Sequence, residues 1–436
     1  MENSQFGLLT KRRFLPLFIT QALGAFDDNV LRNAIAILIT FHLAVKQDLN
    51  APLLVTVAAA LFIAPFFLFS ALAGQLADKY DKGSLVRAIK LGELGFAIVA
   101  GASLFTENAA FMLSVLFLSG TLATFFGPIK YGILPQHLNE RELVGGNAMV
   151  ETGTFLAILL GLLFGGLVVM TNHGIAIVAA TMVVTAIAGY LVALAIPKAP
   201  PPAPDLKIDW NLLSATQAVL AYAFRDRVIL QAMLCISWFW AIGAVFLAQF
   251  PSFTRLVLGA DEAVSNLLIA AFTVGIAIGS LLCNRLLRGA ISARLAPLAG
   301  LALTLCALDL VWASSGLPPA GPQTRLMGFM DFLSTIQHWR VMADLTGMAI
   351  AGGLFVVPLY ALMQSESPPE LRSRIIAAAN IMNALFMAAA TGLAAALIGA
   401  GISIHGVFLV FGLINLMFTV SVLSIAGWRG RATAGR

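Results

Sequence analysis

Five charged side chains of both signs lie inside apolar stretches in the first third of this 436-residue chain. They are Asp27, Asp28, Arg32, Lys130 and Glu151. A charge at the centre of a bilayer costs at least about 2.5–3.5 kcal/mol, so ionisable residues inside membrane spans usually serve a function. An acid holds a cation and a base holds a phosphate. The set therefore suits a polar group that carries both charges and must cross a membrane.

The spacing of these residues leaves two interpretations open. Asp28 and Arg32 are four residues apart and share a helix face, whereas Asp27 points roughly 100° away, toward a neighbouring helix. Lys130 ends one apolar stretch and Glu151 begins the next, so antiparallel helices would bring them to a similar depth. Each pair is either an internal ion pair that neutralises two costly charges or a pair of groups that face a central cavity and bind substrate.

Composition predicts the elements that must position these residues. Apolar residues make up 60% of the chain and charged residues only 11%, whereas a soluble domain has roughly 25% charged residues. A helix needs about 20 apolar residues to cross the hydrocarbon core. Twelve stretches meet this length, which predicts an all-α membrane protein with twelve transmembrane helices. Their approximate ranges are 14–44, 52–77, 84–105, 108–129, 146–170, 173–195, 228–257, 263–287, 291–315, 343–364, 373–399 and 403–427.

A proline-rich segment divides these spans into two groups of six. Residues 197–209 cannot continue a helix, because they contain five prolines, and residues 210–224 read as a surface amphipathic helix. We therefore expect a six-helix half at 1–196, a cytoplasmic linker at 197–227 and a second six-helix half at 228–436. The halves show a faint parallel repeat, since Gly127–Tyr131 resembles Val357–Tyr360 and Asn147 corresponds to Asn380. Such repeats describe the major facilitator fold, whose substrate site lies between the halves.

The basic residues predict the orientation of the chain. Twenty of the 26 lysines and arginines fall on the side that holds both termini, whereas Lys46, Arg255, Arg325 and Arg340 fall on the other. Positively charged loops face the cytoplasm, so both termini are expected there. The first apolar segment is too long for a signal peptide. We interpret it as an ordinary signal-anchor first helix.

The segment Gly74-Gln-Leu-Ala-Asp78-Lys79-Tyr-Asp81-Lys82-Gly83 joins the second and third spans. It resembles the cytoplasmic loop signature of the major facilitator superfamily, except that Asp81 replaces a glycine. The resemblance implies a gating role for Gly74, Asp78 and Lys82. Gly74 would allow close helix approach, and Asp78 would cap a helix or pair with a base. The alternative is a hydrated, charged loop.

Four segments resemble the bacterial lysophospholipid transporter family: Phe26–Asn29, Pro128–Leu134, Glu151–Gly161 and Phe355–Gln364. The resemblance implies movement of lysophospholipids, chiefly lysophosphatidylethanolamine, to the cytoplasmic leaflet by alternating access with lateral entry of the lipid. An acyltransferase/acyl-carrier-protein synthetase on the cytoplasmic side would then re-acylate them. It also implies that Asp28 binds the headgroup. The substrate-contacting residues implied by family and chemistry together are Asp27, Asp28, Asn29, Arg32, Lys130, Tyr131, Glu151, Trp240, Gln249, Gln364 and Asn380.

Two departures from the family bear on these roles. Asp27 replaces a common glycine, and the seventh span lacks an arginine found in some members, so Gln249 would have to make any polar contact there. The second half offers mainly aromatic and neutral polar groups, such as Trp240 and Gln364. One charged wall and one apolar wall suit a lipid that has a single acyl chain.

The sequence also leaves other classes of function to be weighed against a lipid transporter. A proton-coupled exporter of amphipathic drugs or metabolites would use Asp27 or Asp28 as its proton site. A membrane acyltransferase would need a His–Asp pair, and only His137 has an acid, Glu142, five residues on. The three cysteines lie far apart, which argues against disulfides and zinc. We therefore expect a monomer among membrane lipids that is not an enzyme and uses no cofactor, metal or nucleic acid.

Overall fold

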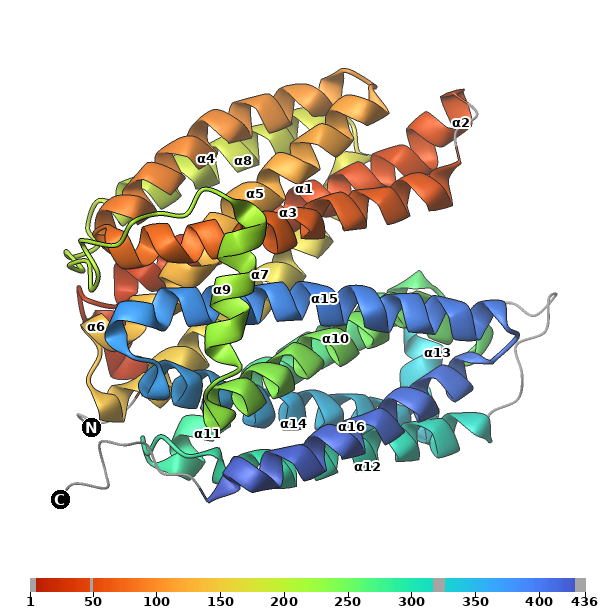
Figure 1. Cartoon of the computed structure of the whole chain (residues 1–436). Helices are drawn as coiled ribbons and strands as arrows, with labels where there is room; N and C mark the ends of the chain where they lie inside the picture. Colours follow the sequence, from red (N-terminus) through yellow and green to blue (C-terminus); the bar gives the residue numbers. More distant parts are fainter. Residues whose placement is uncertain (1–4, 48–49, 317–325, 428–436) are drawn as a thin grey trace. The chain divides into compact units, whose positions relative to one another are not determined.

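The computed structural model describes residues 5–47, 50–316 and 326–427 (Figure 1). These residues form helices and no β-strand. They group into two compact units. The first comprises the described residues up to Asp226 together with Ser367–Ala384, and the second comprises Arg227–Glu366 and the described residues from Leu385 onward. The two units are considered separately below.

The long helices of the first unit pack in pairs. In Figure 1, α1 lies against α7, α3 against α5, and α4 against α8. These helices are α1 (Leu15–Leu38), α3 (Ala51–Lys79), α4 (Lys82–Phe105), α5 (Ala109–Gly132), α7 (Glu140–Val169) and α8 (Gly174–Ala193). The shorter elements are η1 (Gln5–Thr10), the π-helical turn η2 (Ile39–Leu43), α2 (Ala44–Gln47), α6 (Leu134–His137), α9 (Leu212–Ala223) and η4 (Pro369–Leu371).

The second unit is built around α14, which packs against three other long helices, α10, α11 and α12. Its elements are α10 (Arg227–Leu256), α11 (Glu262–Leu287), η3 (Ala293–Leu295), α12 (Ala296–Ser315), α13 (Phe329–Ser334), α14 (Ile336–Glu366) and α16 (Ile404–Ala426). The helix α15 (Arg372–Gly399) belongs to the first unit up to Ala384 and to the second from Leu385.

Eleven helices among the described residues are long and apolar enough to cross a membrane. The helix α1 is also 24 residues long, but it is less apolar because it holds Asp27, Asp28 and Arg32. With α1, the helices correspond to the twelve predicted spans. The predicted surface helix is α9, which contacts α3 and crosses its direction in Figure 1. The segment between the ninth and tenth spans contains α13, and its residues 317–325 lie outside the described part.

Polar side chains at the helix starts explain where several spans begin. Asn139 accepts a hydrogen bond from the Glu142 backbone N–H, and the Glu142 carboxylate accepts one from the Asn139 backbone N–H. This reciprocal arrangement satisfies two N–H groups that the first turn of α7 would otherwise leave unpaired. Asp81 caps α4 by accepting from the Ser84 backbone N–H at 2.7 Å. Each such cap contributes about 1 kcal/mol.

Glycines allow α7 to approach α1 beside the acidic pair. A Cβ placed on Gly161 would lie 2.5 Å from the Phe26 carbonyl oxygen, and one on Gly165 would lie 2.5 Å from the Val30 carbonyl oxygen. Only hydrogen fits at these points. The spacing of four residues puts both glycines on one face, as expected for helix packing inside a membrane. The position of Asp28 is therefore fixed by backbone-to-backbone contact between α1 and α7.

The proline-rich segment is bonded to the first unit along its length. The Ala199 N–H donates to Asp81 at 2.7 Å, and the Ala203 N–H donates to the Asp78 carbonyl at 3.0 Å. The Lys79 ammonium donates to the Leu206 carbonyl at 2.8 Å. Its prolines do break helix structure, as predicted. Several of its carbonyl oxygens and N–H groups nevertheless find partners, so the segment follows the ends of α3 and α4.

Lys90 is buried within α4, whereas its place in the sequence indicated a charge in a loop. We counted it among the charges of a cytoplasmic loop. In the structure it lies eight residues into α4 and is only 2% exposed. It is bonded to Glu93, one turn later on the same helix, at 2.6 Å. It therefore contributes nothing to the loop charge on which the predicted orientation rests, although the bias in the other basic residues remains.

Candidate functional site

The two aspartates of α1 reach different neighbouring helices. Asp28 accepts a hydrogen bond from the Ser119 hydroxyl of α5 at 2.6 Å. Asp27 accepts one from the Thr185 hydroxyl of α8 at 2.5 Å. The two side chains therefore diverge, as their adjacent positions on a helix predict. Each carboxylate has a single hydroxyl donor, which leaves acceptor capacity for a cation.

A small cavity with both polar and apolar lining residues lies beside this pair. Its lining includes Gly24, Asp27, Asp28, Glu93 and Ser119, and its volume is about 20 Å³. A space of this size holds a water molecule but not a phospholipid headgroup. Among the described residues, no three His, Cys, Asp or Glu side chains are arranged to hold a metal ion. The arrangement is a compact, acid-rich pocket beside the lysine of α4.

Arg32 forms no direct ion pair with Asp28 in this structure. Its guanidinium carbon lies 4.7 Å from the centre of the Phe62 ring, and its Nη1 is 3.4 Å from the Asn29 side-chain oxygen. The Asn29 amide in turn donates to the Ala25 carbonyl at 2.7 Å. The described residues contain no ion pair between Asp28 and Arg32. The first of the two structural ion pairs considered above is thus not formed.

The second pair, Lys130 and Glu151, is not joined directly either. The Lys130 ammonium donates to the Thr154 hydroxyl at 2.9 Å and lies 4.9 Å from the centre of the Tyr131 ring. The Tyr131 hydroxyl donates to one Glu151 oxygen at 2.5 Å. The other oxygen of this fully buried carboxylate has no hydrogen-bond partner. The three predicted residues therefore form one cluster that keeps an unused acceptor.

The end of α3, which holds Gly74 and Asp78, contacts the start of α15. The Asp78 carboxylate accepts from the Ser373 backbone N–H at 3.0 Å and from Arg374 Nε at 3.1 Å. It therefore both caps the start of α15 and pairs with a base. A Cβ on Gly74 would lie 2.9 Å from the Arg374 Cα, so this approach requires glycine. Lys82 is buried rather than hydrated.

Asn380 and the residues proposed in the second half have separate surroundings. The Asn380 amide nitrogen is buried without a hydrogen-bond partner, and a Cβ on Gly127 of α5 would lie 2.6 Å from it. In the second unit, Trp240 Nε1 donates to the Tyr360 hydroxyl at 2.9 Å. Gln364 is fully buried and Gln249 is half-buried. Trp240, Gln249 and Gln364 all belong to the second unit.

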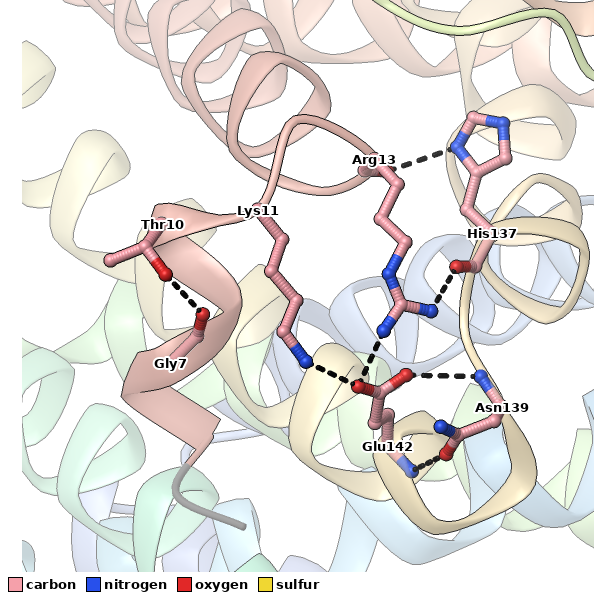
Figure 2. A network of polar contacts seen from close by, with 7 residues as sticks. All are labelled: Gly7, Thr10, Lys11, Arg13, His137, Asn139 and Glu142. Carbon is pink, nitrogen blue, oxygen red and sulfur yellow. Dashed lines mark hydrogen bonds and ion pairs between the residues drawn. The ribbon is translucent and has the colours of Figure 1, made fainter. Parts of the chain in front are cut away.

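The candidate acyltransferase pair belongs to an anchoring network (Figure 2). Glu142 accepts from Lys11 at 2.8 Å and from Arg13 at 2.6 Å. The His137 Nδ1 lies 3.0 Å from the Arg13 carbonyl, and Arg13 donates to the His137 carbonyl at 2.8 Å. Figure 2 shows that the His137 ring points away from the Glu142 carboxylate. The contacts tie the N-terminal segment to the start of α7.

Lys90 and Glu93 are the site residues that sequence reasoning missed. Both lie within a predicted span and are three residues apart, which is a spacing that lets oppositely charged side chains meet on a helix. That spacing was the available signal. It was overlooked because Lys90 lies near other basic residues at the cytoplasmic end of its span, where a loop charge is the usual interpretation.

The comparisons with known proteins agree with this architecture. The model of the Major Facilitator Superfamily matches residues 17–391. The chain is 27% identical over 423 residues to the lysophospholipid transporter LplT of Escherichia coli O1:K1, covering 95% of each chain, and equally identical to that of Escherichia coli O157:H7.

Two solved structures share the fold at 13% sequence identity. The fucose:proton symporter of Escherichia coli gives a TM-score of 0.68 and covers 96% of this chain and 100% of its own. The human organic anion transporter MFSD10 gives 0.73, with 94% and 99% covered. These matches confirm the predicted fold: the chain is a multi-pass membrane protein that belongs to the Major Facilitator Superfamily.

Proposed function

We propose that this protein moves lysophospholipids, chiefly lysophosphatidylethanolamine, across the bacterial inner membrane by alternating access, with lateral access for the lipid. The observation that carries the proposal is the pair of acids on α1, which lies beside a small cavity and has no direct ion pair with Arg32. A transported ammonium group would meet two carboxylates that have acceptor capacity to spare. The similarity to LplT along 95% of the chain supports the same substrate class.

The individual residues are assigned roles on this basis. Asp28 receives the headgroup ammonium, with Asp27, Asn29 and Arg32 shaping the same part of α1. Lys130, Tyr131 and Glu151 form a second polar cluster on the route of the headgroup, and Asn380 adds an amide donor. Trp240, Gln249 and Gln364 provide aromatic and neutral polar contacts from the second unit. Gly74, Asp78 and Lys82 form the cytoplasmic gate.

The same proposal covers the orientation of the protein in the membrane, its oligomeric state and its partner. Both termini face the cytoplasm, as the loop charges favour. The chain acts as a monomer among membrane lipids and delivers its substrate to an acyltransferase/acyl-carrier-protein synthetase in the inner leaflet. The chain itself is not an enzyme, since its relatives are named as transporters and its one candidate catalytic pair is occupied by structural contacts.

The test is movement of labelled lysophosphatidylethanolamine across proteoliposomes that contain the wild type or Asp28→Asn. The variant keeps the side-chain shape and removes the charge. We expect the wild type to move the lipid and the variant to lose at least about 90% of the rate, which corresponds to about 1.4 kcal/mol of lost stabilisation. Size-exclusion profiles in detergent establish that the variant is folded.

The opposite result has a defined meaning. If the wild type moves no lysophospholipid under imposed proton and sodium gradients, the proposal fails. A screen of amphipathic cations with a proton gradient would then examine the exporter alternative. If Asp28→Asn moves the lipid at the wild-type rate, the substrate class stands and the role of Asp28 is wrong.

A further inference from the structure

The ion pair between Lys90 and Glu93 is buried in α4 beside the cavity of the aspartates. The Lys90 ammonium lies 2.6 Å from a Glu93 oxygen and 4.8 Å from the centre of the Phe126 ring. A buried ion pair gives weak stabilisation at best, because desolvation offsets the attraction. The pair is therefore a poor explanation of stability alone, and its position suggests a role in binding.

The contacts of α1 place Lys90 close to the acids. A Cβ added to Gly24 would lie 2.7 Å from the Lys90 ammonium. Gly24 precedes Asp27 and Asp28 by one helical turn and lines the cavity together with them and with Glu93. Lys90 itself stands at the edge of this cavity, against two of its lining residues. A base and three acids thus meet around one small space.

Lys130, the base that the sequence suggested for the phosphate, lies farther away. Ser119 contacts Asp28, and Lys130 follows Ser119 on α5 by eleven residues. At 1.5 Å per residue this separation is about 16 Å along the helix. Lys130 is also held by Thr154, which donates to Gln21 at 2.8 Å. Gln21 precedes Asp28 by about 10 Å along α1.

These separations exceed what one ethanolamine headgroup spans, because only an ester oxygen and two carbons separate its phosphorus from its nitrogen. Along the helices, Lys130 therefore lies farther from the turn that carries Asp28 than Lys90 does. Lys90 is closer, because its ammonium adjoins Gly24, one turn before the acids of α1. Arg32 is one turn from Asp28 but lies over the Phe62 ring, so the base that adjoins the cavity is Lys90.

We infer that the Lys90–Glu93 pair opens to admit a zwitterionic headgroup, with the phosphate on Lys90 and the ammonium shared by Glu93 and Asp28. This inference rests on the proposed function and deepens it. One ion pair is replaced by two, and the net charge of the buried site stays the same. No charged partner is left alone in the membrane interior, which would be strongly unfavourable. An exchange of this kind also makes the room that the closed cavity lacks.

The decisive variant inverts the pair, as Lys90→Glu together with Glu93→Lys. A pair that only neutralises charge tolerates inversion, because the ion pair persists. A pair that recognises the two ends of a headgroup does not, because the base now lies where the ammonium binds. We expect the double variant to keep its thermal unfolding temperature in detergent and to lose at least about tenfold in lysophosphatidylethanolamine transport.

A second comparison uses single variants and two lipids. Lysophosphatidylglycerol has the phosphate but no ammonium. Lys90→Gln should lower transport of both lipids by about tenfold, whereas Glu93→Gln should lower that of the ethanolamine lipid alone by about tenfold. Arg87→Gln is the matched control, since it removes a positive charge near the start of the same helix, where Arg87 contacts Ser84. It should leave the ratio of the two rates unchanged.

The outcomes separate the two proposals. If the wild type moves neither lipid, the proposed function fails. If the wild type is active and the inverted pair is folded and equally active, the pair is structural and the inference is wrong. If the inverted pair does not fold, the ratio of the two lipids in folded Glu93→Gln decides: a fall supports the inference and an unchanged ratio overturns it.

Discussion

Arg32 lies one helical turn after Asp28 on α1, yet the two side chains do not pair. The guanidinium lies over the Phe62 ring of α3, and the carboxylate binds the Ser119 hydroxyl of α5. An ion pair at this spacing would have neutralised both charges within one helix. Its absence leaves Asp28 held by one neutral donor. The acid is thereby positioned without a direct ion pair, which leaves its carboxylate able to accept from a transported cation.

Ser119→Ala tests this positioning. The substitution removes the one hydrogen bond that orients the Asp28 carboxylate. A hydrogen bond to a charged group contributes about 1.5–3 kcal/mol. We expect the KM for lysophosphatidylethanolamine to rise by about tenfold, since the unoriented carboxylate must be ordered when the substrate binds. Transport kinetics in proteoliposomes measure the change.

Ser114→Ala on the same helix is the control, because the Ser114 hydroxyl donates only to the Ala110 carbonyl of its own helix. Equal transport by both variants and the wild type would show that the Ser119 contact has no part in binding. An equal fall in both would point to a general effect of removing a hydroxyl from α5.

Lys130→Ala examines the second polar cluster. Lys130 is bonded to Thr154 and is not paired directly with Glu151. We expect the variant to fold almost as the wild type does and to lose most lysophospholipid transport. Expression level, detergent unfolding temperature and transport are measured together. Loss of folding would instead support a structural role, in which Lys130 offsets the charge of the buried Glu151.

Hydropathy and charge were sufficient to predict the helices and the acids of α1. The spans are long and apolar, so their existence follows from transfer free energy alone. Asp27 and Asp28 stand out because they interrupt such a span in its middle. The use of Gly161 and Gly165 was also predictable from their spacing, since small residues four apart form a packing face.

The partners of each charge were not predictable, because they depend on tertiary packing. The spacing of Asp28 and Arg32 favours an ion pair between them, but Arg32 packs on Phe62 of another helix. In the sequence, Lys90 lies close to basic residues that were assigned to a loop. Only the packing of α4 beside Gly24 identifies it as a buried group. The bonded linker was missed for a similar reason, since its carbonyl partners lie more than a hundred residues away.

Gly161→Ala should move α1 away from α7 beside Asp28. The added Cβ would lie 2.5 Å from the Phe26 carbonyl oxygen, which belongs to the backbone and cannot rotate aside. We expect a loss of about 1–3 kcal/mol in stability, as is usual for overpacking, and a lower transport rate. Gly95→Ala is the control, because nothing lies within 4 Å of the Cβ it would add. Equal unfolding temperatures would contradict the close approach.

The acid that caps α4 predicts a dependence of stability on pH. Burial alone would raise the pKa of Asp81, but hydrogen bonds from Ser84 and Ala199 hold that pKa below its ordinary value. A depressed pKa means that the stabilisation is complete above the unfolded pKa of about 3.9 and is lost as the pH falls through the lower, folded value.

Asp81→Asn should therefore unfold at a lower temperature than the wild type at pH 6. The difference should shrink as the pH is lowered below about 4. Thermal unfolding of both proteins in detergent between these pH values measures it. A difference that is the same at every pH would show that the charge of Asp81 does not contribute.

The bonded linker can be released at one point by Ala203→Pro. Proline has no N–H, so the bond to the Asp78 carbonyl is lost. Because Asp78 also binds the start of α15 through its carboxylate, the linker and the proposed gate share one residue. Losing about 1 kcal/mol would raise the population of the detached linker by about fivefold. Trypsin cleavage at Lys198 and Lys207, which lie within the segment, should accelerate by that factor in detergent.

Ala203→Gly retains the N–H and should be cut far more slowly than the proline variant. Equal rates for the two would show that this hydrogen bond does not hold the segment in place.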